Sequence, residues 1–352
     1  MKRADRGERD SSGAELSVDL MSPAAGVAAP ETPGPETPGP GRPALLVRRW
    51  AYVAYFAALV GIVIAFGVPT GRAELAAVIV VGLLLTSIGQ TWRHATQVVL
   101  DWLPFTAVLL LYDRTRGIAD ALGVPLHEGD VLDAEKSLFG GVEPTVWLQH
   151  HLYHPAHVYW YDAACTLVYT SHFLATPVLA AVLWLRDRTA WLRYISRVVV
   201  LAVAGLITYC LFPEAPPWLA AQDGLTDPVA RLSARGWIAL HASNLNHVLD
   251  NAQKDGSNPV AAMPSLHTAF AVLVAITIGA RLRTRWRWLL VLYPMAMGFT
   301  LVYCGEHYVL DLLAGALFAV VVHLGLNRWE RRRAARREAR ADGPEAPSVS
   351  VL

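Results

Sequence analysis

The sequence predicts an all-α protein, a polytopic membrane bundle of about six to eight transmembrane helices. Hydrophobic residues make up 54% of the 352 residues, and the mean hydropathy is +0.35. Charged residues make up only 17%, whereas soluble domains contain about 25%. The apolar residues also gather in long runs, and a run of about 17–25 apolar residues is long enough to cross a bilayer as a helix.

Eight apolar runs are candidate membrane helices, although a short third run and the closely spaced last two leave the count open by one or two. They lie at 50–68, 74–90, 97–112, 161–185, 191–212, 262–280, 287–304 and 307–327. The repeat ETPGPETPGP is too poor in apolar residues to fold. We therefore expect a disordered Pro/Gly-rich cytoplasmic tail at 1–44, an integral-membrane domain at 45–328, and a basic, disordered cytoplasmic tail at 329–352.

The placement of arginine predicts the orientation of the bundle. Arginines crowd the short connections at one end and the run RWERRRAARREAR at 328–340, whereas the long loops 113–160 and 213–261 hold few. Because cytoplasmic segments are enriched in Lys and Arg, both termini are expected in the cytoplasm and the two long loops outside. The chain has 27 arginines against three lysines, a bias typical of GC-rich coding, so we expect a bacterial plasma membrane.

Charge and cysteine content argue against two other classes of protein. The net charge is +1, which does not indicate a nucleic-acid partner. The three cysteines are too few and too scattered for a disulfide framework or a zinc site: Cys165, Cys210 and Cys304. Oligomeric state cannot be predicted from this sequence.

The histidine-rich stretch PTVWLQHHLYHPAHVYWYD at 144–162 is expected to lie along the membrane surface as an aromatic belt. Metal binding is the alternative for its histidines, because His150 and His154 stand one helical turn apart. However, Pro155 breaks that helix, and no carboxylate or cysteine completes a recognisable ligand set. We therefore predict no metal and no cofactor.

The first motif that indicates chemistry is AAMPSLHTAF at 261–270, at the outer start of the sixth run. Pro264 suits the first position of a helix. A helix N-terminus beside the Ser265 hydroxyl would bind a phosphate group. His267 would project into the same place and donate a proton to a leaving oxygen.

The second motif is GEHYVLDLLAG at 305–315, at the outer start of the eighth run. His307 and Asp311 are four residues apart and would share one helix face. An aspartate that fixes one imidazole nitrogen leaves the other free as a nucleophile. Either His267 or His307 alone is readily explained as a packing residue, but their matched sidedness and the His–Asp pair favour a functional site.

Together, PSLHT and EHYVLDLLAG resemble the type 2 phosphatidic acid phosphatase and haloperoxidase superfamily, and more narrowly its branch of inositol phosphorylceramide synthases. The resemblance covers about residues 98–326 and would place the phosphatase-type core in the C-terminal half. It implies that His307 attacks phosphorus to form a phosphohistidine and that Asp311 orients it. It also implies that His267 protonates the leaving group and that Ser265 holds phosphate oxygens.

The sequence departs from the family pattern in its basic residues. No KxxxxxxRP motif is present; YCLFPEAPPW at 209–218 takes its place, and Thr300 and Leu301 stand where the third motif often has SR. Phosphate therefore needs another cation, and arginine binds it through a bidentate fork. We rank Arg116 and Arg231 first among the outer cations, which also include Arg114, Arg235 and Lys254.

Two further residues complete the predicted site. His172 lies two to three turns into the fourth run, where it would line the lipid pocket, relay a proton or pack between helices. Tyr308 is a further candidate for the pocket. Glu306 adjoins His307 but points to a different helix face, so we assign it no catalytic role.

The expected function is cleavage or transfer of a lipid phosphate ester at the outer leaflet. Water as acceptor would make the protein a phosphatase, and a lipid or polyol hydroxyl would make it a phosphotransferase. A covalent histidine intermediate serves both reactions, so the motifs leave the two open. The alternative is a proton-coupled transporter of lipid or small molecules, which predicts two related halves with interrupted helices; the sequence shows no such repeat.

Overall fold

The computed structural model describes residues 42–66, 72–112, 118, 121–240 and 258–341, and every named element in these ranges is a helix. This confirms the all-α prediction. Most of the predicted N-terminal tail and residues 342–352 lie outside the described residues, so the structure does not test their disorder.

Each of the eight predicted helices is present. They are α1 (Arg42–Phe66), α2 (Arg72–Leu84), α3 (Trp92–Tyr112), α7 (Trp160–Arg186), α8 (Arg188–Leu211), α12 (Leu266–Gly279), the 3₁₀ helix η2 (Arg285–Val291) with α13 (Leu292–Tyr303), and α14 (Val309–Ala341). Among the described residues, four helices are long and apolar enough to cross a membrane: α1, α7, α8 and α14. The chain is therefore a helical membrane protein.

Two predicted boundaries are wrong. Helix α14 continues to Ala341, so residues 329–341 of the predicted disordered tail are helical, because alanine, arginine and glutamate are strong helix formers. Helix α12 begins at Leu266, so Pro264 is not its first residue. Ser265 is instead the N-cap, and its hydroxyl oxygen accepts a hydrogen bond from the Thr268 amide at 3.3 Å.

Helix α12 lies at the centre of the C-terminal half and packs against α7, α8, α13 and α14. At Gly315, α14 comes very close to the residue before α12. A Cβ atom there would stand 2.2 Å from the carbonyl oxygen of Ser265, so only glycine permits this approach. In the same place the Ser265 amide donates a hydrogen bond to the Asp311 carbonyl at 3.0 Å. The starts of α12 and α14, which carry the two motifs, are thereby fixed together.

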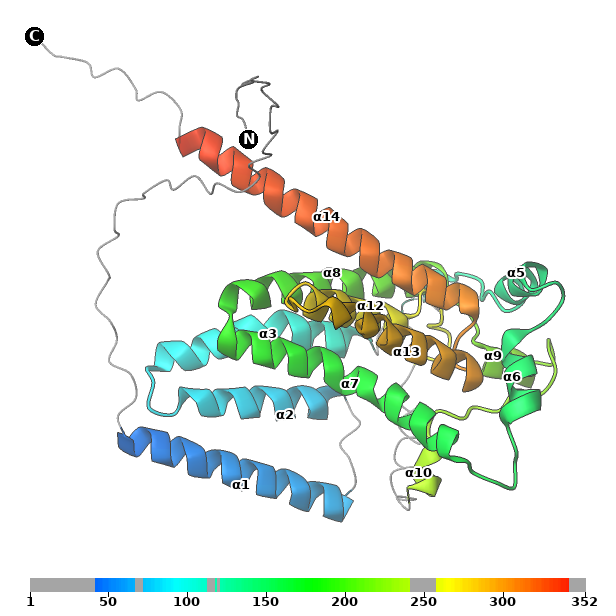
Figure 1. Cartoon of the computed structure of the whole chain (residues 1–352), viewed down its shortest axis with the longest axis horizontal. Coiled ribbons are helices and arrows are strands. Elements are labelled where there is room, and N and C mark those ends of the chain that lie inside the picture. Colours follow the sequence, from blue (N-terminus) through cyan, green and yellow to red (C-terminus); the bar gives the residue numbers. More distant parts are fainter. Residues whose placement is uncertain (1–41, 67–71, 113–117, 119–120, 241–257, 342–352) are drawn as a thin grey trace, which may run out of the picture. The chain divides into compact units, whose positions relative to one another are not determined.

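Short helices from the two long loops gather at the end of the bundle where α14 begins (Figure 1). They are α5 (Asp130–Leu138), α6 (Pro144–Leu152) and α9 (Pro217–Gln222). A fourth, α10 (Gly236–Ala239), packs against α7. There the Gly236 amide donates a hydrogen bond to the Thr166 hydroxyl at 2.9 Å. These contacts dock the loops onto the helices that carry the histidines.

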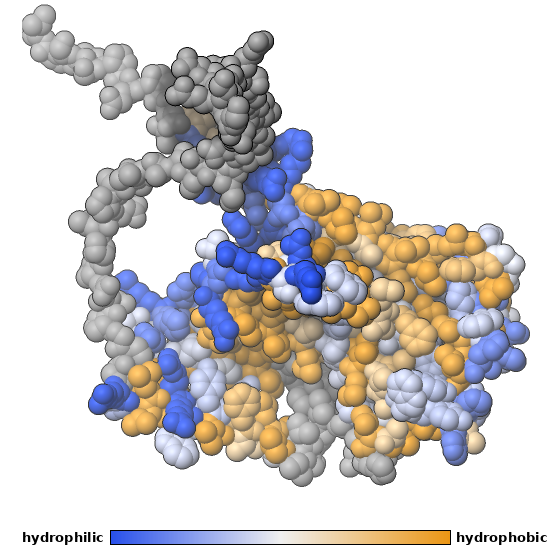
Figure 2. Space-filling view, viewed as in Figure 1, coloured by the Kyte–Doolittle hydropathy of each residue, from blue (hydrophilic) through white to orange (hydrophobic). Residues whose placement is uncertain are grey.

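The sides of the helices expose many large apolar side chains, including Leu174 and Val178 of α7 and Leu317 and Val321 of α14. Figure 2 shows apolar residues over much of one face, with hydrophilic residues over the last part of α14. An apolar belt of this kind suits lipid chains.

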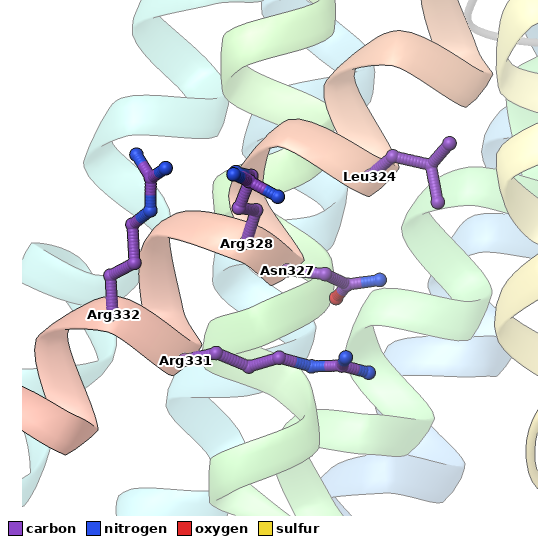
Figure 3. Close-up of a pocket in the computed structure, with 5 residues that line it drawn as sticks. All are labelled: Leu324, Asn327, Arg328, Arg331 and Arg332. Atoms are coloured by element: carbon purple, nitrogen blue, oxygen red, sulfur yellow. The ribbon is translucent and has the colours of Figure 1, made fainter.

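A hollow of about 380 Å³ lies beside the second half of α14 (Figure 3). Its lining residues all come from that helix: Leu324, Asn327, Arg328, Arg331 and Arg332. At 1.5 Å per residue, the nearest of them is about 20 Å along the helix from Asp311. The basic half of α14 is therefore separate from the histidine motifs.

Candidate active site

The two predicted histidines face each other. Nε2 of His307 lies 3.4 Å from Nδ1 of His267, and Nδ1 of His307 lies 3.3 Å from Oδ2 of Asp311. Asp311 is fully buried and His307 is 4% exposed. The structure thus brings three predicted residues into one chain of contacts, although His267 and His307 are 40 positions apart in the sequence.

His307 lies in the turn between α13 and α14 and not on α14 itself, which begins at Val309. The predicted shared helix face is therefore inexact, yet the contact forms, because Asp311 sits in the first turn and its Oδ2 also accepts the Tyr308 amide at 2.9 Å. Gly305 makes the turn possible: its φ is +75°, and a Cβ would stand 2.8 Å from Cγ1 of Val229.

Ser265 and His267 reach the site from the start of α12. Ser265 is fully buried, and its hydroxyl oxygen is engaged in the N-cap described above. Because the first amides of a helix carry partial positive charge, this end of α12 is a favourable place for an anion. A phosphate held by Ser265 would contact the same hydroxyl oxygen that accepts the hydrogen bond from the Thr268 amide.

His267 stands in an aromatic pocket built by α7. Its ring centroid is 4.1 Å from that of His172 and 5.1 Å from that of Tyr169, which stacks on it. This position is compatible with each of the three roles predicted for His172, which are to line the lipid pocket, to relay a proton or to pack between helices. Tyr308 is placed differently: it is 2% exposed and packs with Val131 and Leu132 of α5 in an apolar cluster.

Arg231 is anchored directly beside His307. Its Nε and Nη2 donate to the two carboxylate oxygens of Glu306 at 2.9 and 3.0 Å. Its guanidinium also lies 4.8 Å from the centroid of the Trp218 ring. Glu306 accepts a third bond, from the Ser233 hydroxyl at 2.5 Å. Arg116, Arg114 and Lys254 lie outside the described residues, so the structure places only Arg231 of the two preferred cations.

Three buried polar residues of the site were not predicted. The side chain of Gln149 joins α6 to the second long loop and to the end of α13, donating to the carbonyls of Ala230 and Tyr303, both at 2.8 Å. Glu135 of α5 accepts the first amide of α14, that of Val309, at 2.8 Å. Glu214 is fully buried in the segment between α8 and α9. Only Glu214 had a sequence signal, as the one charged residue in YCLFPEAPPW.

Burial changes the acidity of two of these carboxyls. Desolvation raises the pKa of Glu135 to about 7, against a hydrogen bond from Val309 that lowers it. Desolvation and the neighbouring Asp311 carboxyl raise the pKa of Glu214 far above its usual range. Of these two carboxyls, Glu214 is therefore the weaker acid.

Arg235 holds the backbone of the histidine-rich stretch 144–162. Nη2 of Arg235 donates to the carbonyl oxygens of His154, Pro155 and His157 at 2.7, 3.1 and 2.9 Å. Across the described residues, no three His, Cys, Asp or Glu side chains gather as a set that would hold a metal ion. This loop is shaped by arginine and by aromatic contacts.

Comparison with known proteins identifies the family of the chain. The family profile of the PAP2 superfamily matches residues 129–325, more than half of the chain. The chain belongs to the PAP2 superfamily. The matched region contains both histidine motifs, α5 and the Glu214 segment, which confirms the resemblance drawn from the motifs alone.

A relative of this PAP2 protein from Bacteroides thetaiotaomicron is named phosphoinositol dihydroceramide synthase. It is 25% identical over 229 residues, which cover 62% of this chain and 73% of the relative. No solved structure matches the chain. With its family and its apolar helices, this PAP2 protein is a membrane enzyme that cleaves or transfers lipid phosphate esters.

Proposed function

We propose that this PAP2 enzyme acts at the outer leaflet of a plasma membrane through a phosphohistidine on His307. The observation that carries the proposal is the double contact of the His307 ring. Its Nδ1 faces the Asp311 carboxylate at 3.3 Å, and its Nε2 faces His267 at 3.4 Å. Nδ1–H is then held by Asp311, which leaves the lone pair on Nε2 for attack.

The reaction has two displacement steps. In the first, Nε2 of His307 forms a bond to phosphorus while the P–O bond to the leaving alcohol breaks. The electron pair of that bond goes to the leaving oxygen, which takes a proton from His267. In the second, His267 removes the proton of an acceptor hydroxyl, whose oxygen displaces His307 from phosphorus. In-line displacement requires phosphorus between the rings, so substrate binding must widen the 3.4 Å gap.

The phosphate oxygens would be held by Ser265, the N-terminus of α12 and Arg231. Replacement of Arg231 by lysine keeps the charge but loses the guanidinium, which Glu306 holds through Nε and Nη2 and whose remaining N–H groups would bind the phosphate. KM for the lipid phosphate should therefore rise at least about tenfold. Glu306→Gln is the control, because it disturbs the ion pair and leaves the guanidinium. Equal effects of the two substitutions would assign Arg231 to structure only. Arg116 stays a candidate for the same role.

Outward orientation is supported by charge. The motifs lie at the start of α14, and its arginines lie in the second half, where Arg331 and Arg332 line the hollow of Figure 3. Asp223→Cys and Arg336→Cys test it with a membrane-impermeant thiol reagent on intact cells. Labelling is expected at position 223 at once and at position 336 only after permeabilisation. The reverse pattern would place the site inside.

The acceptor is decided by product analysis. Purified enzyme in detergent is given phosphatidic acid or phosphatidylinositol, each with and without ceramide. The inositol and ceramide arms follow from the name of the Bacteroides relative. Free phosphate from phosphatidic acid identifies a phosphatase. A new lipid that appears only with ceramide identifies a phosphotransferase. Products formed equally by His307→Ala would refute the proposed chemistry in either case.

A further inference from the structure

We propose that Glu214 is a positioning residue of this site: as a neutral carboxylic acid, it donates its O–H to Oδ1 of Asp311 and so fixes the carboxylate that orients His307. The inference rests on the proposed function for its catalytic consequence. Its structural content, a proton held between two named carboxyls, is independent of that function.

The backbone of Glu214 is clamped on both sides. Its amide donates to the carbonyl of Val260 at 2.9 Å, and the flanking Pro213 and Ala215 pair with His127 at 2.9 and 3.1 Å. Glu214 thereby forms parallel bridges with both His127 and Ala261. The side chain is completely buried. Its position is therefore set by two loops, with no freedom to reach solvent.

Three oxygen atoms behind His307 have no ordinary donor. Within the described residues, both carboxyl oxygens of Glu214 and Oδ1 of Asp311 lack a hydrogen-bond partner. Hydrogen bonding to Asp311 nevertheless contributes to the raised pKa of Glu214, which places the two carboxyls next to each other. Two adjacent ionised carboxylates would repel each other, whereas one shared proton makes a hydrogen bond between them. Such a proton gives a partner to Oδ1 of Asp311 and to one oxygen of Glu214.

The surroundings decide which carboxyl carries the proton. Oδ2 of Asp311 accepts the Tyr308 amide and faces the His307 imidazole, so this carboxyl already serves as a hydrogen-bond acceptor. Glu214 has no such donor. Its pKa is raised by burial first and then by the Asp311 and Glu135 carboxyls. Glu214 is therefore the acid, and Asp311 is the carboxylate.

Among the described residues of the neighbouring elements, no cation balances the two carboxyl groups. Glu135 faces Glu214 from α5, and Tyr308 faces it from the turn before α14; both are acidic or neutral groups. The imidazole of His127 turns to Asp130, with Nδ1 2.6 Å from Oδ2. The O–H of Glu214 thus supplies the second donor that holds Asp311 in place.

The experiment compares Glu214→Leu with Glu214→Gln. Leucine removes the donor, so kcat should fall about tenfold with KM changed less than about threefold. Loss of a donor to the Asp311 anion should also shift the acidic limb of kcat against pH upward. Glutamine offers an N–H in the same place, so Glu214→Gln should keep most of the activity and the wild-type position of the acidic limb. Full activity of the leucine variant, or equal damage by both, would overturn the proposal.

An infrared measurement keeps the test independent of activity and of folding of the leucine variant. Wild-type enzyme at about pH 8 should absorb as a protonated carboxyl, because Glu135, with a pKa of about 7, is then ionised. Glu214→Gln should remove that band, and His307→Ala should keep it while abolishing activity. A wild-type spectrum without the band contradicts the proton on Glu214. If His307→Ala keeps both the band and full activity, the proposed function is refuted and the proton on Glu214 is not.

Discussion

Asp311 contacts two consecutive residues through one atom: its Oδ2 lies 3.3 Å from Nδ1 of His307 and accepts the Tyr308 amide at 2.9 Å. The amide contact caps the first turn of α14 and fixes the carboxylate. The imidazole contact then fixes the ring. The start of the helix and the orientation of the proposed nucleophile therefore depend on the same side chain.

Asp311→Asn tests this dependence. The amide oxygen still accepts from Tyr308, so the fold should persist, but the amide group no longer favours Nδ1–H of His307. We expect kcat to fall by roughly 10²–10⁴, with a smaller change in KM. Steady-state kinetics beside a thermal unfolding curve measure both. A variant with unchanged kcat would remove Asp311 from the mechanism.

His267→Ala separates the roles of the two histidines. A general acid contributes about 10²–10⁴ in rate when the leaving alcohol needs a proton. The variant should therefore lose this factor with a dialkyl or alkyl lipid phosphate and lose much less with an aryl phosphate, whose leaving oxygen needs no proton. The ratio of the two rates is the measurement. Equal losses with both substrates would be inconsistent with acid catalysis by His267.

Gly315→Ala tests the crossing of α12 and α14. The added methyl group would stand 2.2 Å from the Ser265 carbonyl oxygen, so the helices must separate and His267 must move relative to His307. We expect a lower Tm and loss of most activity. Gly325→Ala is the matched control on the same helix, because nothing lies within 4 Å of its Cβ position. Similar behaviour of the two variants would argue against a tight crossing.

Glu135 predicts a pH dependence of stability. Its folded pKa of about 7 exceeds its ordinary value of 4.5. Its contribution to the free energy of unfolding is therefore complete below the ordinary value and is lost as pH rises through about 7. The wild-type Tm should fall between about pH 5 and 8. Glu135→Gln keeps the acceptor for Val309 and should flatten that change; an identical slope in the variant would exclude Glu135 as its origin.

Much of the bundle and of the site was predictable because the signals are local. Runs of apolar residues marked the eight helices, and short motifs placed Ser265, His267, His307 and Asp311 at helix starts. The errors were also local. Pro264 does not begin α12; Ser265 is its N-cap. Helix α14 continues through a segment that we predicted to be disordered because of its charge, although its alanines and arginines favour a helix.

The remainder of the site depends on contacts between distant segments. Glu135 reaches an amide 174 residues away at Val309, and Gln149 reaches a carbonyl 154 residues away at Tyr303. Arg231 finds Glu306 only because the second loop folds back over the turn before α14. No periodicity or spacing encodes such pairings, so the sequence did not reveal that Glu306, which we assigned no catalytic role, is a buried anchor for Arg231.

A phosphohistidine on His307 can be trapped directly. Enzyme and a lipid phosphate carrying radioactive phosphorus are mixed, quenched in denaturant within one turnover, and the label bound to protein is counted. We expect label on the wild type that disappears when acceptor is added, and none on His307→Ala. Product formed by the wild type without any protein-bound label, or label that persists in His307→Ala, would contradict a phosphohistidine on His307.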